Sequence, residues 1–136
     1  MFKGKHALVT GAAGGIGTSI VEKLRAQGAK VVVADRVTEG IAAEAHLPGD
    51  LLDGLYCDGL AAAASVALGG LDIVINNAGV ITRGPVTETS DADWDLSMGV
   101  NVEAPFRICR AAIPLMAETG GGTIVNTASG TVRQNE

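Results

Sequence analysis

The stretch HALVTGAAGGIG, residues 6–17, decides the fold of this chain. Its first half, residues 6–11, is a short apolar run that ends in glycine, as a buried strand does. Across residues 15–27 the apolar side chains recur at helical spacing. The run KVVVAD, residues 30–35, follows and is continuously apolar, which is typical of a parallel strand buried on both faces. The sequence therefore opens with a strand–helix–strand unit, whose crossover we expect to be right-handed.

The remainder of the chain repeats this alternation of strands and helices. Further strands are predicted at residues 54–58, 71–79 and 121–129, and helices at residues 60–68, at a segment that Ser90 or Asp91 would cap, and at residues 101–117 with a kink at Pro114. Residues 39–47 predict one or two helical turns. This order indicates an α/β protein with a Rossmann-type, doubly wound parallel sheet, and we expect residues 1–136 to form one dinucleotide-binding domain. Such sheets bind their ligands at the carboxyl ends of the strands.

The composition argues against several other classes of protein. The net charge of −5 lacks the basic balance that nucleic-acid binding needs. No apolar run approaches the roughly 18 residues of a membrane span. Cys57 and Cys109 lack the spacing of a metal or redox site, and His6 and His46 form no metal-binding pair, so we expect no metal and a cytoplasmic protein with reduced thiols.

The turn TGAAGGIG, residues 10–17, carries the first functional signal. Gly11, Gly15 and Gly17 permit a tight turn and let the backbone approach a pyrophosphate, while the helix N-terminus offers N–H groups to the phosphates. A Walker A loop is excluded because the Gly-Lys-Ser/Thr ending is missing. The alternative interpretation is a tight turn that binds no ligand.

Asp35 ends the second predicted strand, 18 residues after Gly17. A carboxylate at this place can accept hydrogen bonds from the adenosine ribose diol and would repel a 2′-phosphate, which predicts NAD in preference to NADP. Arg36 weakens that preference, because its guanidinium could pair with a phosphate. The alternative is that Asp35 is only a solvated charge in a turn.

Four motifs in this order resemble the short-chain dehydrogenase/reductase family. They are TGAAGGIG at residues 10–17, NNAG at 76–79, NVEAPF at 101–106 and GGTIVNTAS at 121–129. The resemblance covers nearly the whole chain. It implies a Rossmann-type sheet that binds NAD(H) or NADP(H), and hydride transfer between nicotinamide C4 and the carbon of a small alcohol or carbonyl substrate. It also implies a homo-oligomer when the protein is full length. From the charge and the lack of a long apolar run we expect no nucleic-acid or membrane partner.

The resemblance also implies roles for particular residues. Gly11, Gly15, Ile16 and Gly17 would line the phosphates, Asp35 would hold the adenosine ribose, and Asp58 would lie near the adenine amino group after the third strand. Asn77, Ala78 and Gly79 would support the sheet and touch the cofactor. Asn101 would hold a water in a proton relay, and Ser129 would bind the substrate oxygen. An amide can position a water, and a hydroxyl can donate to a developing alkoxide.

The family's general acid/base, a tyrosine in a Tyr-x-x-x-Lys motif, has no match in this sequence. The one tyrosine, Tyr56, lies in the third predicted strand. We therefore expect a family fold truncated after its fifth strand and inactive alone, whether it is a piece of a longer enzyme, a shortened gene product or a deliberate shortening. The alternatives are a non-catalytic dinucleotide-binding fragment and a Rossmann-like methyltransferase, against which NNAG and NTAS argue.

Overall fold

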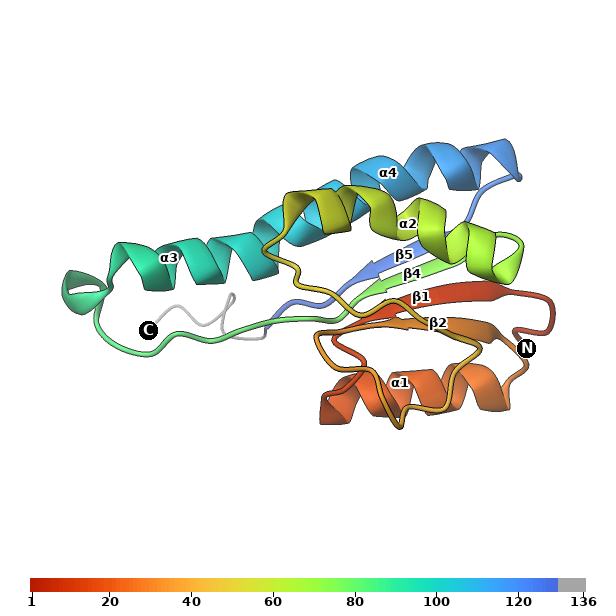
Figure 1. The fold of residues 1–136 in the computed structure, drawn as a ribbon, viewed down its shortest axis with the longest axis horizontal. Coiled ribbons are helices and arrows are strands. Elements are labelled where there is room, and N and C mark those ends of the chain that lie inside the picture. Colours follow the sequence, from red (N-terminus) through yellow and green to blue (C-terminus); the bar gives the residue numbers. More distant parts are fainter. Residues whose placement is uncertain (130–136) are drawn as a thin grey trace.

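The computed structural model describes residues 1–129, in which five parallel strands form one sheet with the order β3-β2-β1-β4-β5. Helix α1 covers one face of this sheet, and α2 and α4 cover the other (Figure 1). The predicted doubly wound α/β sheet is thereby confirmed. The elements are β1 (His6–Thr10), α1 (Gly15–Ala26), β2 (Lys30–Ala34), β3 (Ala45–His46), α2 (Gly54–Leu68), β4 (Ile73–Asn76), a 3-10 turn (Val86–Glu88), α3 (Asp91–Met98), a π-helical turn (Gly99–Glu103), α4 (Ala104–Glu118) and β5 (Thr123–Asn126).

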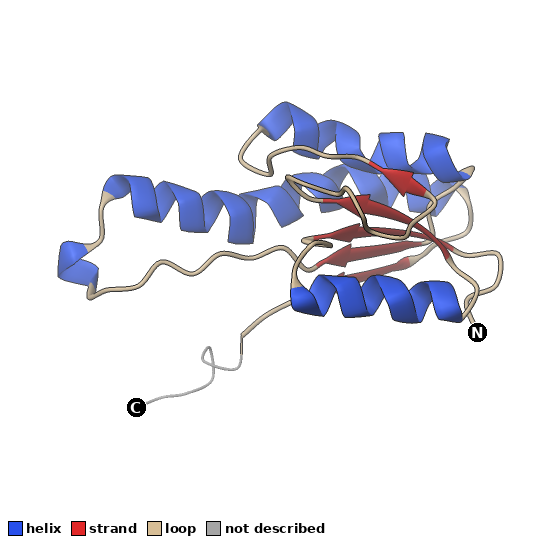
Figure 2. Cartoon of the chain, turned by 60° about the horizontal axis from the view of Figure 1, so that its bottom comes forward, coloured by secondary structure: helices blue, strands red, loops and turns tan. Residues whose placement is uncertain are grey.

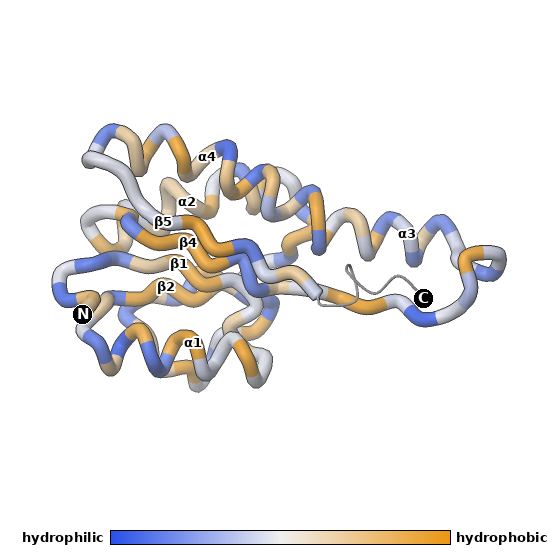
Figure 3. The backbone as a smooth tube through the Cα atoms, turned by 180° about the vertical axis from the view of Figure 1, so that it is seen from behind, coloured by the Kyte–Doolittle hydropathy of each residue, from blue (hydrophilic) through white to orange (hydrophobic). Residues whose placement is uncertain are grey.

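The core lies on both faces of the central strands, because successive side chains of a strand point to opposite sides. In β1, Leu8 packs with the cluster under α2 and α4, whereas Ala7 and Val9 pack with the cluster over α1. All three side chains are fully buried. Figure 3 shows hydrophobic and hydrophilic residues alternating along α1, as a helix with one face on the sheet requires.

The third predicted strand is wrong, because residues 54–58 form the first turns of helix α2. Asp53 begins this helix: its carboxylate accepts hydrogen bonds from the N–H groups of Leu55 and Tyr56, at 3.0 and 3.4 Å. Residues 60–68 continue the same helix, as predicted. A short apolar run is compatible with either a strand or a buried helix turn. The N-cap residue Asp53 is the feature of the sequence that favours the helix.

The strand next to β2 is instead β3, Ala45–His46, which pairs with Val32 and Val33. Residues 39–47 therefore do not form the predicted helical turns. Glu44 ties this segment to the sheet edge, since its carboxylate accepts the Val31 N–H at 2.6 Å and the Arg25 Nε–H at 3.2 Å. Burial opposes the charge of Glu44, but these two donors hold the pKa of its carboxyl below the ordinary value.

The second half of the chain follows the predicted order with one change of boundary. Ser90 caps α3, as predicted, by accepting the Asp93 N–H at 3.1 Å. The predicted helix over residues 101–117 is split into a π-helical turn, Gly99–Glu103, and α4, which contains Pro114. Figure 2 shows α3 extending beyond the sheet, and no residue of α3 is buried.

Thr10, the last residue of β1, joins β1 to β4 through its side chain. Its hydroxyl donates to the Ile75 carbonyl at 3.4 Å and accepts the N–H groups of Asn77 and Ala78 at 3.1 and 3.2 Å. The residue is only 1% exposed. One buried hydroxyl therefore sets where the chain leaves β4.

We expect Thr10→Val to lower the free energy of unfolding by about 1–3 kcal/mol, because valine keeps the shape and leaves two partly buried N–H groups without their acceptor. Urea unfolding followed by circular dichroism measures this loss. Thr10→Ser is the matched control, since it keeps the hydroxyl and removes one methyl group. A Thr10→Val variant as stable as Thr10→Ser would contradict the assigned role.

Candidate functional site

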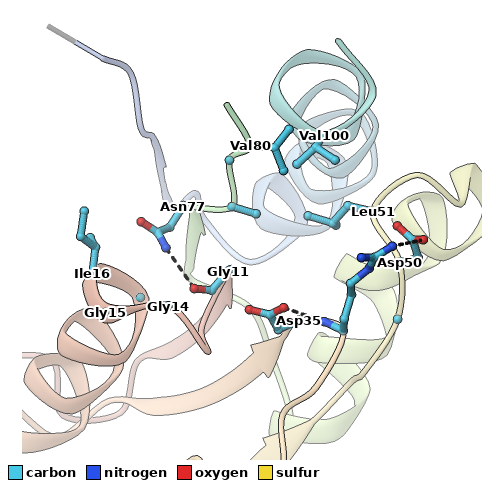
Figure 4. Close-up of a pocket in the computed structure, with 15 residues that line it drawn as sticks. Gly11, Gly14, Gly15, Ile16, Asp35, Asp50, Leu51, Asn77, Val80 and Val100 are labelled. Atoms are coloured by element: carbon cyan, nitrogen blue, oxygen red, sulfur yellow. Dashed lines mark hydrogen bonds and ion pairs between the residues drawn. The ribbon is translucent and has the colours of Figure 1, made fainter. Parts of the chain in front are cut away.

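The candidate site is a cavity of about 390 Å³ at the carboxyl ends of the strands. Its wall is built from the glycine-rich turn after β1, the end of β2, the segment before α2 and the chain after β4 (Figure 4). Val100, in the π-helical turn, completes it. Segments far apart in the sequence thus meet at one place.

Two glycines allow the glycine-rich turn to pack against its neighbours. Gly11 has a φ of +63°, and a Cβ there would lie 2.7 Å from the Ala78 Cα. A Cβ on Gly17 would lie 2.0 Å from the Gly11 carbonyl oxygen. Both positions therefore require glycine for the fold itself, whatever the cavity binds.

Gly15 differs from these two glycines, because a Cβ there would meet no atom within 4 Å. No contact within the described chain explains its lack of a side chain. It lines the cavity at the first residue of α1, so the room it leaves belongs to the cavity.

The start of α1 presents backbone donors to the cavity. Gly14 is the N-cap and has no side chain to accept them. Within residues 1–129, no hydrogen bond is made by the N–H groups of Gly15, Ile16 and Gly17. Ile16 is 70% exposed and also lines the cavity. Free N–H groups at a helix N-terminus favour an anion such as a phosphate.

Asp35 follows β2 and points its carboxylate along the cavity wall, where it is held in place by the backbone (Figure 4). One oxygen accepts the Ala13 N–H of the glycine-rich turn at 3.0 Å, and the other accepts the Arg36 N–H at 2.7 Å. A carboxylate has about four acceptor positions, so two remain for hydroxyl groups of a ligand.

Asp50 and Leu51 also line the cavity, although no motif of the sequence pointed to either of them. Asp50 accepts the Leu52 N–H at 2.9 Å and forms an ion pair with Arg36 at 3.2 Å. These donors, the Leu52 amide first, lower the pKa of the Asp50 carboxyl. The signal that could have found Asp50 is its position after Pro48-Gly49, once β3 is placed before it.

Two side chains in the first turn of α2 bind the segment that precedes this helix and carries Asp50 and Leu51. The Tyr56 hydroxyl donates to the Leu47 carbonyl, and the Cys57 thiol lies 3.2 Å from the Leu51 carbonyl. Burial raises the pKa of Tyr56 to about 12 and that of Cys57 to about 11. Both side chains therefore keep their protons near neutral pH and act here as hydrogen-bond donors.

The chain after β4 brings Asn77, Ala78 and Gly79 to the cavity wall. The Asn77 side chain donates to the Gly11 carbonyl at 3.2 Å, which links this segment to the glycine-rich turn. Asn101 lies in the π-helical turn and makes a two-way contact with Val80, accepting its N–H at 2.9 Å and donating to its carbonyl at 2.8 Å. The Asn101 amide thus holds the wall of the cavity.

Ser129 lies beyond the end of β5 and is exposed; it is not one of the described residues that line the cavity. Three residues before Ser129, Asn126 joins the carboxyl end of β5 to that of β4, since its side chain accepts a hydrogen bond from the Asn76 amide at 2.8 Å. The Thr127 N–H continues this pairing by donating to the Asn76 carbonyl at 3.1 Å. The path of the chain toward Ser129 is therefore set by β4.

The predicted position of Asp58 after a strand is wrong, since Asp58 lies within α2 and outside the cavity lining. Its carboxylate pairs with Arg107 at 3.0 Å and Arg110 at 3.1 Å and so ties α2 to α4. Desolvation opposes its charge, but the two arginines hold the pKa of Asp58 below the ordinary value. The carboxylate that does reach the cavity from this part of the chain is Asp50.

Two kinds of feature are absent from residues 1–129. This part of the chain holds no group of three or more histidine, cysteine, aspartate or glutamate side chains placed to bind a metal ion. None of its helices is long and apolar enough to span a membrane.

Comparison with known proteins places the chain among oxidoreductases. It is 42% identical over 138 residues to D-threitol dehydrogenase of Mycolicibacterium smegmatis, with 93% of this chain and 53% of the relative covered. It is 36% identical to 2,5-dichloro-2,5-cyclohexadiene-1,4-diol dehydrogenase LinX of Sphingobium indicum, covering 93% of this chain and 55% of that protein. The chain thus spans about half the length of these relatives.

Solved structures agree with this placement. One match is the crystal structure described as "a putative short-chain alcohol dehydrogenase from Sinorhizobium meliloti 1021". Its TM-score is 0.91 and its identity 38%, over 98% of this chain and 57% of the other. A metagenomic short-chain oxidoreductase in complex with NADP matches with a TM-score of 0.82 and 34% identity, over 90% of this chain and 60% of the other. The family described as "short chain dehydrogenase" matches residues 5–135. The chain belongs to the short-chain dehydrogenase family.

Proposed function

We propose that this chain is the dinucleotide-binding part of an NAD(H)-dependent oxidoreductase that interconverts a secondary alcohol and a ketone. One observation carries the proposal: N–H groups at the start of α1, unpaired within residues 1–129, face a cavity that Gly15 leaves open, with the Asp35 carboxylate on the same wall. Family membership supports the reaction class, and two relatives are dehydrogenases of hydroxyl compounds by name.

The residues present fit a nicotinamide dinucleotide. In the proposal, the amides of Gly15, Ile16 and Gly17 hold the pyrophosphate, and Asp35 accepts hydrogen bonds from the adenosine ribose. In the same proposal, Asp50 and Leu51 lie beside the adenine, which is the position that the family resemblance implied for Asp58. The cofactor, when bound, accepts or donates a hydride at its nicotinamide ring.

Other residues would act toward the substrate end of the cavity. We propose that Asn77, Ala78 and Gly79 keep the wall near the nicotinamide in place through their contacts with Thr10 and Gly11. Asn101 would position a water for proton transfer, and Ser129 would donate to the substrate oxygen. These two roles come from the family resemblance and are tested by substitution in a full-length protein.

The preference for NAD over NADP rests on Asp35. Its carboxylate is fixed by two backbone amides and cannot turn away from the cavity without losing them. A 2′-phosphate beside it would meet like charge at short range. Two related structures are complexes with NADP, so this preference is a property proposed for this chain and not for its relatives.

The second candidate function is a dinucleotide-binding fragment without catalysis. It is favoured by the position of the one tyrosine of the sequence, since Tyr56 is held to the Leu47 carbonyl in α2 and its pKa is raised by burial. A tyrosine with a raised pKa is a poor general base at neutral pH.

Gly15→Ala should fold normally and bind NADH at least about tenfold more weakly, because the added methyl meets no protein atom but enters the space of the phosphates. Isothermal titration calorimetry measures the affinity, and thermal unfolding checks the fold. Gly59→Ala is the matched control, since it makes the same change at an open helical position in α2. Unchanged NADH binding by Gly15→Ala would contradict the proposed phosphate site.

Asp35→Asn should shift the ratio of NADH to NADPH affinity toward NADPH by at least about tenfold, because it removes a negative charge within a few ångströms of the 2′ position. Titration of both dinucleotides gives the ratio. Asp58→Asn changes the net charge equally but outside the cavity, so it should leave the ratio unchanged. An equal ratio in wild type and Asp35→Asn would overturn the assigned role of Asp35.

The 136-residue chain alone should show no turnover of secondary alcohols or polyols with NAD, because its sequence contains no Tyr-x-x-x-Lys pair to transfer the substrate proton. The absorbance of NADH, followed with chain whose mass is verified by mass spectrometry, tests this. Turnover by the pure chain would mean that another of its residues serves as the acid or base.

A further inference from the structure

Arg36 is held between two carboxylates at the β2 end of the cavity. Its backbone N–H donates to one oxygen of Asp35 at 2.7 Å, and its guanidinium Nη2 lies 3.2 Å from an oxygen of Asp50. The other oxygen of Asp50 accepts the Leu52 N–H at 2.9 Å. Because the backbone fixes Asp50, the guanidinium is drawn to one side of the cavity mouth.

Arg36 is also the cationic side chain of the cavity wall. Among the described residues that line the cavity, no other lysine, arginine or histidine is present. A guanidinium binds phosphate well, since its planar N–H groups match the phosphate oxygens. Arg36 follows the residue proposed to hold the adenosine ribose, so a 2′-phosphate would have to recruit this guanidinium away from Asp50.

We propose that Asp50 is a specificity-determining residue: by pairing with Arg36, it withholds the guanidinium from a 2′-phosphate and so strengthens the preference for NAD over NADP. The inference rests on the proposed dinucleotide function and adds a second source of the preference for NAD. Asp35 repels the phosphate directly, whereas Asp50 acts through Arg36.

The solvent exposure of the Arg36–Asp50 ion pair sets how strongly Asp50 can change the ratio of NADPH to NADH affinity. The side chains of Arg36 and Asp50 are 74% and 45% exposed, so solvent screens their attraction. Exposed ion pairs of this kind correspond to about a two- to fivefold change in an equilibrium constant. Asp50 should therefore modulate the discrimination by this factor, while Asp35 provides the larger part of it.

A double-mutant cycle separates this mechanism from direct repulsion of the phosphate by Asp50. Affinities for NADH and NADPH are measured by calorimetry for wild type, Asp50→Asn, Arg36→Leu and the double variant. We expect Asp50→Asn to raise the ratio of NADPH to NADH affinity about two- to fivefold, and to raise it much less when Arg36 is absent.

The control for net charge is Glu39→Gln, which removes an exposed carboxylate from the loop after β2 and should leave the ratio unchanged. The inference is overturned if Asp50→Asn leaves the ratio unchanged, or if it changes the ratio equally with and without Arg36. Failure of wild type to bind either dinucleotide would instead overturn the proposed function itself.

Discussion

The structure depends on a close backbone contact between the turn after β1 and two other segments. Gly11 packs against Ala78 on one side and against Gly17 on the other, at distances that leave no space for a Cβ. Thr10 supports the same junction with its buried hydroxyl. Because backbone meets backbone here, α1 begins directly over the ends of the central strands, and its first N–H groups open onto the cavity.

The polar residues around the cavity are held mainly by backbone groups. The Asp35 carboxylate is fixed by two amides, Asp50 by the Leu52 amide, and Asn101 by both polar groups of Val80. Backbone groups move little once the sheet has formed, so these side chains are oriented before any ligand arrives. Such preorganisation reduces the conformational cost of binding.

Charge is distributed unevenly around this cavity. The start of α1 supplies positive potential without a basic side chain, whereas the β2 end holds Asp35 and Asp50 with Arg36 between them. This pattern suits the proposed dinucleotide, whose phosphates would lie at the start of α1 and whose ribose hydroxyl groups would lie at Asp35. The acidic net charge of the chain is compatible with the proposed anionic ligand, because amides and not lysines would hold the anion.

Much of this protein was determined by local sequence. The strands β1, β2 and β4, helix α1, the Ser90 cap and the tight turn at Gly11 and Gly17 follow from short patterns, because strand periodicity, glycine and capping chemistry act between near neighbours in the chain. Only the tertiary structure decided where β3 pairs, that residues 54–58 are helical, that Asp58 binds two arginines of α4, and that Asp50 reaches both Arg36 and the cavity. These outcomes depend on contacts between residues distant in sequence, and a short apolar or acidic segment has no local preference strong enough to decide among them.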